Sequence, residues 1–212
     1  MKSLGILLQL GDSGLPTGGF SQSFGLEQYL HRGEVHDRDS FLKWLQAYIS
    51  SQLKYTDALL IRLCYEGVPE SVLADMATAA TIPAEVHAAD SAMANRLRNI
   101  AVNVLGVDDS PVAPAHPAIE FARVAQRFEV PLEPALTTHL SAAVQNITLN
   151  AVRSVPLGQT DGQRAVMAAH EWVAAVCAEV HELDQSELGI VLPGFEIAQM
   201  EHERLRARMF IS

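Results

Sequence analysis

The segment LEPALTTHLSAAVQNITLNAVRSV, residues 132–155, decides which fold this chain can adopt. Its apolar side chains recur every three or four positions, at Leu136, Leu140, Val144, Ile147, Ala151 and Val155. This spacing places them on one face of a helix, and that face has to be buried against other helices. The pattern recurs after a break at 156–162, with Val166, Ala169, Val173, Val176, Val180 and Leu183. The two segments therefore predict a pair of packed helices.

Further helices are predicted on both sides of this pair. The expected ranges are 23–31, 40–66, 70–80, 83–105 and 118–128, followed by a final helix or tail at about 195–210. Ser21 or Ser23 is expected to cap the first of these helices. Asp39 or Ser40 is expected to cap the second. Periodicity does not decide whether the apolar residues 1–10 form a helix or a strand.

The composition agrees with an all-α protein. Hydrophobic residues make up 49% of the 212 residues and aromatic residues only 6%, and runs of β-branched residues are rare. Such a chain can bury a sizeable core, and this balance favours packed helices over a β-sandwich. Because we find neither a repeat nor a domain boundary, we expect a single-domain helical bundle over residues 1–212.

Charge and cysteine content argue against several classes of function. The formal net charge of −10 disfavours nucleic-acid binding, which needs clustered Lys and Arg. Cys64 and Cys177 belong to no C-x-x-C pair, so we interpret them as buried free thiols. The sequence has no apolar run as long as a membrane span and no leader pattern at its start. We therefore expect a cytoplasmic protein that binds neither nucleic acid nor membranes.

The Gly-rich segment GDSGLPTGG, residues 11–19, is similar to a phosphate-binding loop only in its glycines. The Lys that would neutralise the phosphates is missing after its last glycine. The following SQSFG, residues 21–25, lacks the first glycine of a serine-hydrolase nucleophile elbow. Two interpretations stay open: a tight turn between two helices, or a turn that also presents Ser13, Ser21, Ser23 and Glu27.

The histidines and acidic residues do not predict a stable metal site. His181 and Glu182 are adjacent in a helical segment and point in different directions, so they do not bind one ion together. The sequence contains no H-E-x-x-H motif. We expect no stable metal site within one chain, whereas a transient contact, or one between two copies, stays open.

The C-terminal residues 200–212 allow two interpretations. They combine acidic and basic side chains with Leu205, Met209 and Phe210. One interpretation is an amphipathic helix that caps the bundle. The other is a docking tail, at about 195–212, whose apolar residues wait for a partner.

Three segments together resemble the urease accessory protein F family. LLQLGDSGLPTGGFSQSFGLEQYL, residues 7–30, is similar to the family's D-S-x-L-P-x-G-G-F/Y-S and S-x-G-L-E patterns. AVRSVPLGQTDGQR, residues 151–164, is similar to its basic residue followed by P-L-G-Q-x-x-G-Q. IAQMEHERLRARMFIS, residues 197–212, is similar to its M-x-H-E…R-L-F-R-S ending. The matches follow one another in order along the chain, whereas residues 32–144 match only in helical character.

The resemblance implies an all-α protein that forms a two-fold homodimer and is not an enzyme. Such proteins bind the urease accessory protein D/H and recruit the GTPase accessory protein G. The complex docks on apo-urease and couples GTP hydrolysis to nickel delivery. Nickel is then a cargo that passes through a channel in the complex, and no resident cofactor is implied.

The resemblance also assigns roles to residues. Glu27 is expected to be a channel or partner-contact residue, and a carboxylate in a polar turn is expected to add little to the core. The remaining candidates for partner binding or the nickel path are Ser21, Ser23, Arg153, Gln159, Gln163, His202, Glu203, Arg208 and Phe210. Ile211 stands where the family has Arg, and Arg206 stands at a commonly aromatic position. Both departures lie in the docking tail and leave its partner contacts open.

The alternative interpretation is a stand-alone helical protein unrelated to urease. It would act either as a metal-binding bundle or as a general adaptor. It is favoured only if the three similar segments are accidental.

Overall fold

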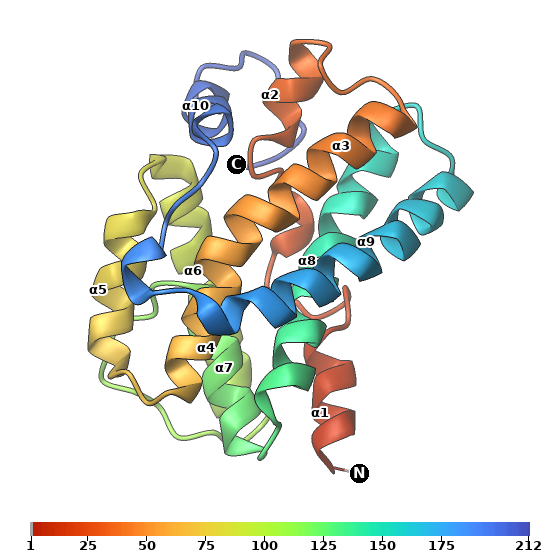
Figure 1. The fold of residues 1–212 in the computed structure, drawn as a ribbon. Coiled ribbons are helices and arrows are strands. Elements are labelled where there is room, and N and C mark those ends of the chain that lie inside the picture. Colours follow the sequence, from red (N-terminus) through yellow and green to blue (C-terminus); the bar gives the residue numbers. More distant parts are fainter. Residues whose placement is uncertain (1) are drawn as a thin grey trace.

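Residues 2–212, which the computed structural model describes, form helices joined by loops and contain no strand (Figure 1). The prediction of an all-α protein is therefore confirmed. The first helices are α1 (Lys2–Leu10), α2 (Leu26–His31), α3 (Arg38–Tyr48), α4 (Leu59–Tyr65) and α5 (Glu70–Ala80). They are followed by α6 (Ala84–Asn103), α7 (Pro117–Arg127), α8 (Leu132–Ser154), α9 (Gln159–Glu179) and α10 (Pro193–His202).

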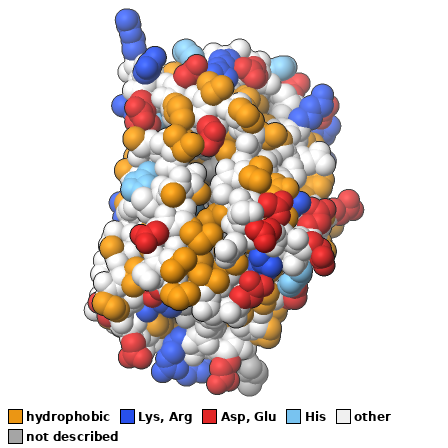
Figure 2. All heavy atoms as spheres, turned by 60° about the vertical axis from the view of Figure 1, so that its left-hand side comes forward, with side chains coloured by type: hydrophobic (Ala, Val, Ile, Leu, Met, Phe, Trp, Pro, Cys, Tyr) orange, Lys and Arg blue, Asp and Glu red, His pale blue; other side chains and the backbone are white. Residues whose placement is uncertain are grey.

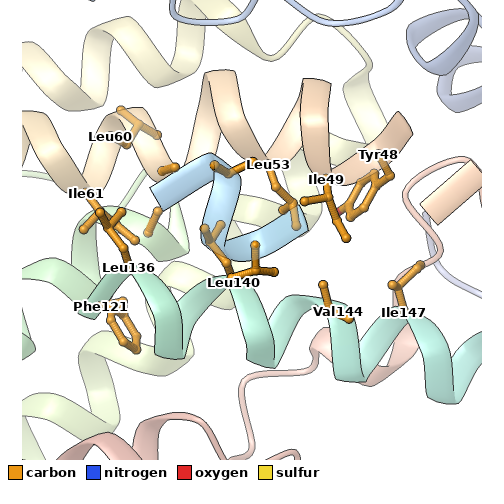
Figure 3. Close-up of a cluster of buried hydrophobic side chains, with 14 of the residues drawn as sticks. Tyr48, Ile49, Leu53, Leu60, Ile61, Phe121, Leu136, Leu140, Val144 and Ile147 are labelled. Carbon is orange, nitrogen blue, oxygen red and sulfur yellow. The ribbon is translucent and has the colours of Figure 1, made fainter. Parts of the chain in front are cut away.

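The two segments with the clearest periodicity form α8 and α9, which pack against each other as predicted. Leu140 and Val144 of α8 are at most 1% exposed. Figure 3 shows them pointing toward Ile49 and Leu53 of the neighbouring long helix. Fully burying one such side chain stabilises the fold by about 1.5–3 kcal/mol. The apolar stripe of α8 therefore lies at the centre of the core.

A glycine allows α8 and α9 to approach closely. A Cβ atom added at Gly162 of α9 would lie 2.7 Å from Cγ2 of Val152 on α8. That separation is well below the 3.5–4.0 Å of an ordinary carbon contact. Gly162 belongs to the PLGQTDGQ part of the chain, so this glycine has a role in packing.

The long helix predicted at 40–66 differs from the prediction at its start and in its middle. Asp37 accepts a hydrogen bond from the backbone N–H of Ser40 and is the N-cap, so the prediction of Asp39 or Ser40 was wrong. Between α3 and α4 the backbone forms a π-helix at Ile49–Ala58. π-Helical turns are rare and occur frequently at functional sites.

The cap of one further helix was also predicted incorrectly, whereas the sequence left open whether residues 195–210 form a helix or a tail. Gly25 is the N-cap of α2 and no side chain caps this helix, so neither Ser21 nor Ser23 has that role. α10 ends at His202, and residues 203–212, which we call the terminal segment, are not helical.

Aromatic side chains hold α10 against α2 and α3. The ring centroid of Trp44 lies 5.4 Å from that of Phe195 on α10 and 6.2 Å from that of Tyr29 on α2. Trp44 also stacks on Tyr48 with a centroid distance of 5.2 Å. Each such pair adds about 0.5–1.5 kcal/mol beyond the burial of its area. The start of α10 is thereby held beside α2 and α3, and the ribbon shows α10 next to α2 (Figure 1).

The two cysteines are free thiols, as predicted. Cys177 is buried and Cys64 half-buried. Burial raises the pKa of the Cys64 thiol to about 12, so it stays protonated and unreactive at neutral pH. None of the helices within residues 2–212 combines the length and apolar content that a membrane crossing requires.

Candidate functional site

The marker segment, residues 11–27, consists of turns, a short 3₁₀-helix at Gly19–Ser21 and the first two residues of α2, and it borders a cavity of about 120 Å³. Gly18 has a φ of 92°, in the left-handed region that favours glycine. Asp12, Ser13 and Thr17 line the cavity from this side. The segment is therefore a turn that also forms one wall of a cavity.

Two carboxyl groups and two imidazoles in the cavity wall come from separate elements, namely Asp57 in the π-helix, Asp90 on α6, His116 before α7, and His139 on α8. Nε2 of His139 lies 2.8 Å from an oxygen of Asp57. Nε2 of His116 lies 3.6 Å from an oxygen of Asp90. The cavity wall thus holds two pairs of a carboxyl group and an imidazole.

Burial and the neighbouring groups shift the pKa values of these side chains in different directions. Burial, and then the charge of Asp57, raise the pKa of Asp90 well above its usual range. Burial also opposes ionisation of Asp57, but its hydrogen bond with His139 and the nearby imidazoles hold its pKa below the usual value. Burial lowers the pKa of His116. Burial thus favours the protonated form of Asp90 and the neutral form of His116, whereas the hydrogen bond with His139 favours the ionised form of Asp57.

A second cavity of about 20 Å³ borders the first, toward α10. The two cavities share Gln52, Asp90 and His116 in their linings. Within residues 2–212, no three His, Cys, Asp or Glu side chains are arranged to hold a metal ion. The cavities therefore offer oxygen and nitrogen donors in succession rather than one closed coordination site.

The terminal segment returns to the marker segment, where Glu27 holds it. One oxygen of Glu27 accepts the backbone N–H of Met209 at 2.6 Å, and the other accepts that of Phe210 at 3.1 Å. Glu27 is only 6% exposed. The expectation that this carboxylate adds little to the fold was therefore wrong, because it is buried and satisfies two backbone donors.

His202, the last residue of α10, is completely buried between two carboxylates. Its Nε2 lies 2.9 Å from Glu27, and its Nδ1 lies 2.7 Å from Glu85 on α6. Arg208 of the terminal segment also pairs with Glu85. We call Glu27, His202 and Glu85 the triad; it joins α2, α6, α10 and the terminal segment.

The end of the terminal segment pairs with the marker segment through the backbone. Ile211 donates its N–H to the carbonyl oxygen of Ser21 at 2.9 Å. Ser23 donates its N–H to the carbonyl oxygen of Ser212. Two predicted site residues, Ser21 and Ser23, therefore act here through their main chain.

Arg153 at the end of α8 connects the same two segments. Its guanidinium donates to the carbonyl oxygen of Phe20 at 2.7 Å. It also lies 5.6 Å from the ring centroid of Phe210, a distance at which a cation is attracted to an aromatic face. Residues from all three similar segments thus meet at one place in the fold.

The other predicted site residues lie at the surface. Gln159 and Gln163 are exposed on the first turns of α9. Glu203 is exposed at the start of the terminal segment. The structure therefore brings Ser21, Ser23, Glu27, Arg153, His202, Arg208 and Phe210 together and leaves these three residues outside the triad.

Sequence patterns did not point to Glu85 or to Asp57, Asp90, His116 and His139 of the cavity. All of them lie within residues 32–144, where no motif is recognisable. One signal was available, because Asp57 lies at helical spacing between Leu53 and Leu60, on a stripe that is otherwise buried. An acidic residue on such a stripe indicates a buried polar site.

Comparison with known proteins gives consistent results. The family model named UreF matches residues 35–170. The urease accessory protein UreF of Paenarthrobacter aurescens is 44% identical, over 97% of this chain and 96% of the relative. The UreF proteins of Corynebacterium efficiens and Geobacillus kaustophilus are 40% and 36% identical, each over 97% of this chain and over 95% and 96% of their own lengths.

Proposed function

Because this chain belongs to the UreF family of urease accessory proteins, we propose that it is a cytoplasmic, non-catalytic assembly factor for urease. It bridges the D/H-type accessory protein and the G-type GTPase and helps to load nickel into apo-urease. The observation that carries this proposal is the meeting of the marker segment, the end of α8 and the terminal segment.

The region where these segments meet suits a protein partner. Phe20, Met209 and Ile211 are exposed apolar side chains there. Arg153 and Arg208, both exposed, lie among them. Apolar side chains beside Arg are typical of protein interfaces. Ile211, which stands where the family has Arg, adds apolar area to this surface. We therefore expect the surface to bind an apolar patch on the partner.

We also propose that the protein forms a two-fold homodimer. Figure 2 views the side of α5, α6 and α10, where hydrophobic side chains gather across the middle of the face. Exposed apolar residues on these helices include Val72, Ile197 and Met200. Exposed apolar patches are typical of association sites. A monomeric mass by light scattering at micromolar concentration would contradict the dimer.

We assign the nickel path to the two adjoining cavities and not to Glu27, whose two oxygens are already engaged by backbone N–H groups and His202. The paired carboxyl and imidazole groups of the cavities would hold a divalent ion briefly, because few donors converge at any point. Asp90 has to release its proton before it binds a cation. Nickel transfer should therefore weaken as the pH falls.

Co-purification with the two partners tests this function. The chain is co-expressed with the D/H-type protein and the G-type GTPase, and a stable complex is expected. Arg153→Ala should weaken the complex because it removes the contacts with Phe20 and Phe210. Arg164→Ala is the matched control, because Arg164 is exposed and pairs only locally with Asp161. Absence of any complex with the wild-type chain would contradict the proposal.

The alternative of a stand-alone protein predicts different results. A metal-binding bundle requires tight, stoichiometric binding of nickel by the isolated chain, which calorimetry measures directly. An unrelated adaptor requires unchanged nickel-dependent urease activity after deletion of the gene. Loss of that activity, together with weak nickel binding, would favour the assembly factor.

A further inference from the structure

The larger cavity opens to solvent at the marker segment. Three of the residues that line it are exposed, namely Asp12, Ser13 and Phe20, and all three belong to this segment. The other lining residues, on α1, α3, α6, α7, α8, the π-helix and the adjoining loops, are buried or half-buried. A residue that is both exposed and part of the lining lies where the cavity reaches the surface. The marker segment therefore lies at the entrance of the cavity.

Residues 12–17, which we call the entrance loop, are held together by hydrogen bonds within the loop. Oδ1 of Asp12 accepts the N–H of Gly14 at 2.7 Å. The carbonyl oxygen of Asp12 accepts the N–H of Leu15 at 3.0 Å, and that of Leu15 accepts the N–H of Thr17 at 2.7 Å. These bonds stay intact when the loop as a whole changes its position. The entrance loop is therefore built to move as one body.

Glycines flank the entrance loop on both sides. Gly11 precedes it, and Gly18 follows it with a φ of 92°, in the left-handed region that glycine adopts without steric cost. Beyond Gly18 the chain is anchored, because the buried Asn150 of α8 donates to the carbonyl oxygen of Gln22 at 2.6 Å. Residues at the ends of a moving segment have to absorb its changes in φ and ψ. The two glycines are suited to that role.

A side chain of α6 holds the entrance loop from outside. Arg96 reaches across from this helix, and its Nη1 donates to the carbonyl oxygen of Thr17 at 3.1 Å. The guanidinium lies directly over Gly18, where an added Cβ atom would overlap Nη1. The absence of a side chain at Gly18 thus allows Arg96 to reach the loop. From below, the half-buried Leu15 packs against the hydrophobic core.

We propose that the entrance loop is a lid over the cavity and that Arg96 is the positioning residue that keeps it closed. Opening breaks the hydrogen bond to Thr17, lifts Leu15 from the core and turns the backbone at the flanking glycines. Closure separates the carboxyl and imidazole groups of the cavity from solvent, so that a weakly held cation is not lost to solution. The inference rests on the proposed function only for the identity of this solute, because the lid is a property of the chain alone.

Labelling of a thiol inside the cavity tests the lid without nickel and without a partner. Ala143 of α8 lines the cavity, and Ala143→Cys places a thiol there. Methyl methanethiosulfonate converts an accessible thiolate into a methyl disulfide. Mass spectrometry of peptides from the full chain gives the labelling rate at each cysteine. In the folded chain, the introduced thiol should react more slowly than in the urea-unfolded chain, because the lid is closed most of the time.

Arg96→Met in the same background removes the hydrogen bond to Thr17. The introduced thiol should then react about fivefold faster, the factor that corresponds to the net contribution of one hydrogen bond. The native Cys177, buried on α9, reports global unfolding in the same sample and should keep its rate. Arg96→Lys retains a charged donor and should restore most of the protection. Gly18→Ala should also speed labelling, because its Cβ displaces the guanidinium.

Arg164→Met is the matched control, because Arg164 is exposed on α9 and pairs locally with Asp161. It should leave the labelling rate unchanged. The proposal is overturned if the introduced thiol reacts equally fast in the folded and the unfolded chain. It is also overturned if Arg96→Met leaves this rate unchanged, or accelerates Cys177 by the same factor. If Ala143→Cys fails to fold, Ala142→Cys in the same lining takes its place.

Failure of the lid and failure of the proposed function give different results. If the wild-type chain forms no complex with the D/H-type protein and the G-type GTPase, the proposed function is contradicted and the labelling rates are unaffected. If the labelling rate of Arg96→Met equals that of the chain with Arg96, the lid is contradicted and complex formation is unaffected.

Discussion

Replacing Glu27 with Ala removes both acceptors of the Met209 and Phe210 amides and one partner of His202. A buried donor left without a partner costs about 1–3 kcal/mol. We expect Glu27→Ala to lower the free energy of unfolding by about that amount, measured by urea denaturation. Glu34→Ala is the control, because the Glu34 side chain is exposed. Equal stability of the two variants would show that the buried contacts contribute nothing.

The buried carboxyl group of Asp90 should make the stability of the fold depend on pH, in a direction that follows from its raised pKa. Its pKa is raised by burial, so the folded chain binds this proton more tightly than the unfolded chain does. The resulting stability is complete below the unfolded value of about 3.9 and is lost as the pH rises toward the raised pKa. Because Asn does not ionise, Asp90→Asn should gain in Tm relative to wild type as the pH rises from about 4 to about 8.

For Asp37, the same measurement of Tm against pH should show a dependence of the opposite sign. Its hydrogen bonds with Ser40 hold the pKa of this exposed carboxyl below the usual value. Its contribution is therefore present above the unfolded pKa and is lost as the pH falls. Asp37→Asn keeps a good N-cap residue but should lose Tm relative to wild type as the pH rises. If the Tm of both variants and of the wild type changed with pH in parallel, the shifted pKa values of Asp90 and Asp37 would be refuted.

At the scale of elements, Gly162 decides how closely α8 and α9 pack. Ala is the better helix former by about 1 kcal/mol, but its Cβ would lie 2.7 Å from Val152. Overpacking of this kind costs about 1–3 kcal/mol, so Gly162→Ala should be destabilising in thermal or urea unfolding. Gly5→Ala on α1 is the matched control, because nothing lies within 4 Å of its added Cβ. It should be stabilising by about 0.5–1 kcal/mol.

Most helices could be predicted because their signals are local. The stripes of α8 and α9 follow from spacing alone, and Glu70–Ala80 forms α5 at the predicted residues. The π-helix at Ile49–Ala58 could not be predicted, because its sequence also fits an ordinary α-helix. The sequence left open whether residues 195–210 are helix or tail for another reason: residues 203–212 gain more from contacts with distant residues than from helical hydrogen bonds.

At the scale of the whole molecule, Arg98 ties several elements together. On α6, it pairs with Glu120 of α7 and with Glu70 of α5, and it donates to the carbonyl oxygen of Ser110 in the loop before α7. Glu120 is 1% exposed. Removing one partner of such a buried pair costs about 3–5 kcal/mol, so Arg98→Met should lower the free energy of unfolding by that order.

An exposed arginine controls for the loss of positive charge. Arg38 pairs with its exposed neighbour Asp39, and such surface pairs contribute little. Arg38→Met should therefore unfold at nearly the same urea concentration as wild type. A similar effect of the two substitutions would contradict the role of Arg98 as a buried connector.

The candidate site is a property of the whole molecule, which explains why sequence reasoning found only part of it. Glu27 and His202 lie in recognisable segments, but 175 positions separate them. Glu85 is 117 positions from His202 and sits in the first turn of α6, where an acidic residue is ordinary. Spacing along a chain carries no information about such pairs, so only the fold identifies the triad.

The position of Trp44 gives the molecule an optical reporter. Trp44 is 5% exposed, its indole lies against Phe195 of α10, and the indole N–H has no hydrogen-bond partner within residues 2–212. Any movement that lifts α10 admits water to this ring and shifts its emission toward longer wavelengths. Trp172, the other tryptophan of the chain, lies half-buried on α9. With Trp172 replaced by Phe, the fluorescence of Trp44 alone can follow α10 while partners bind, without an attached dye.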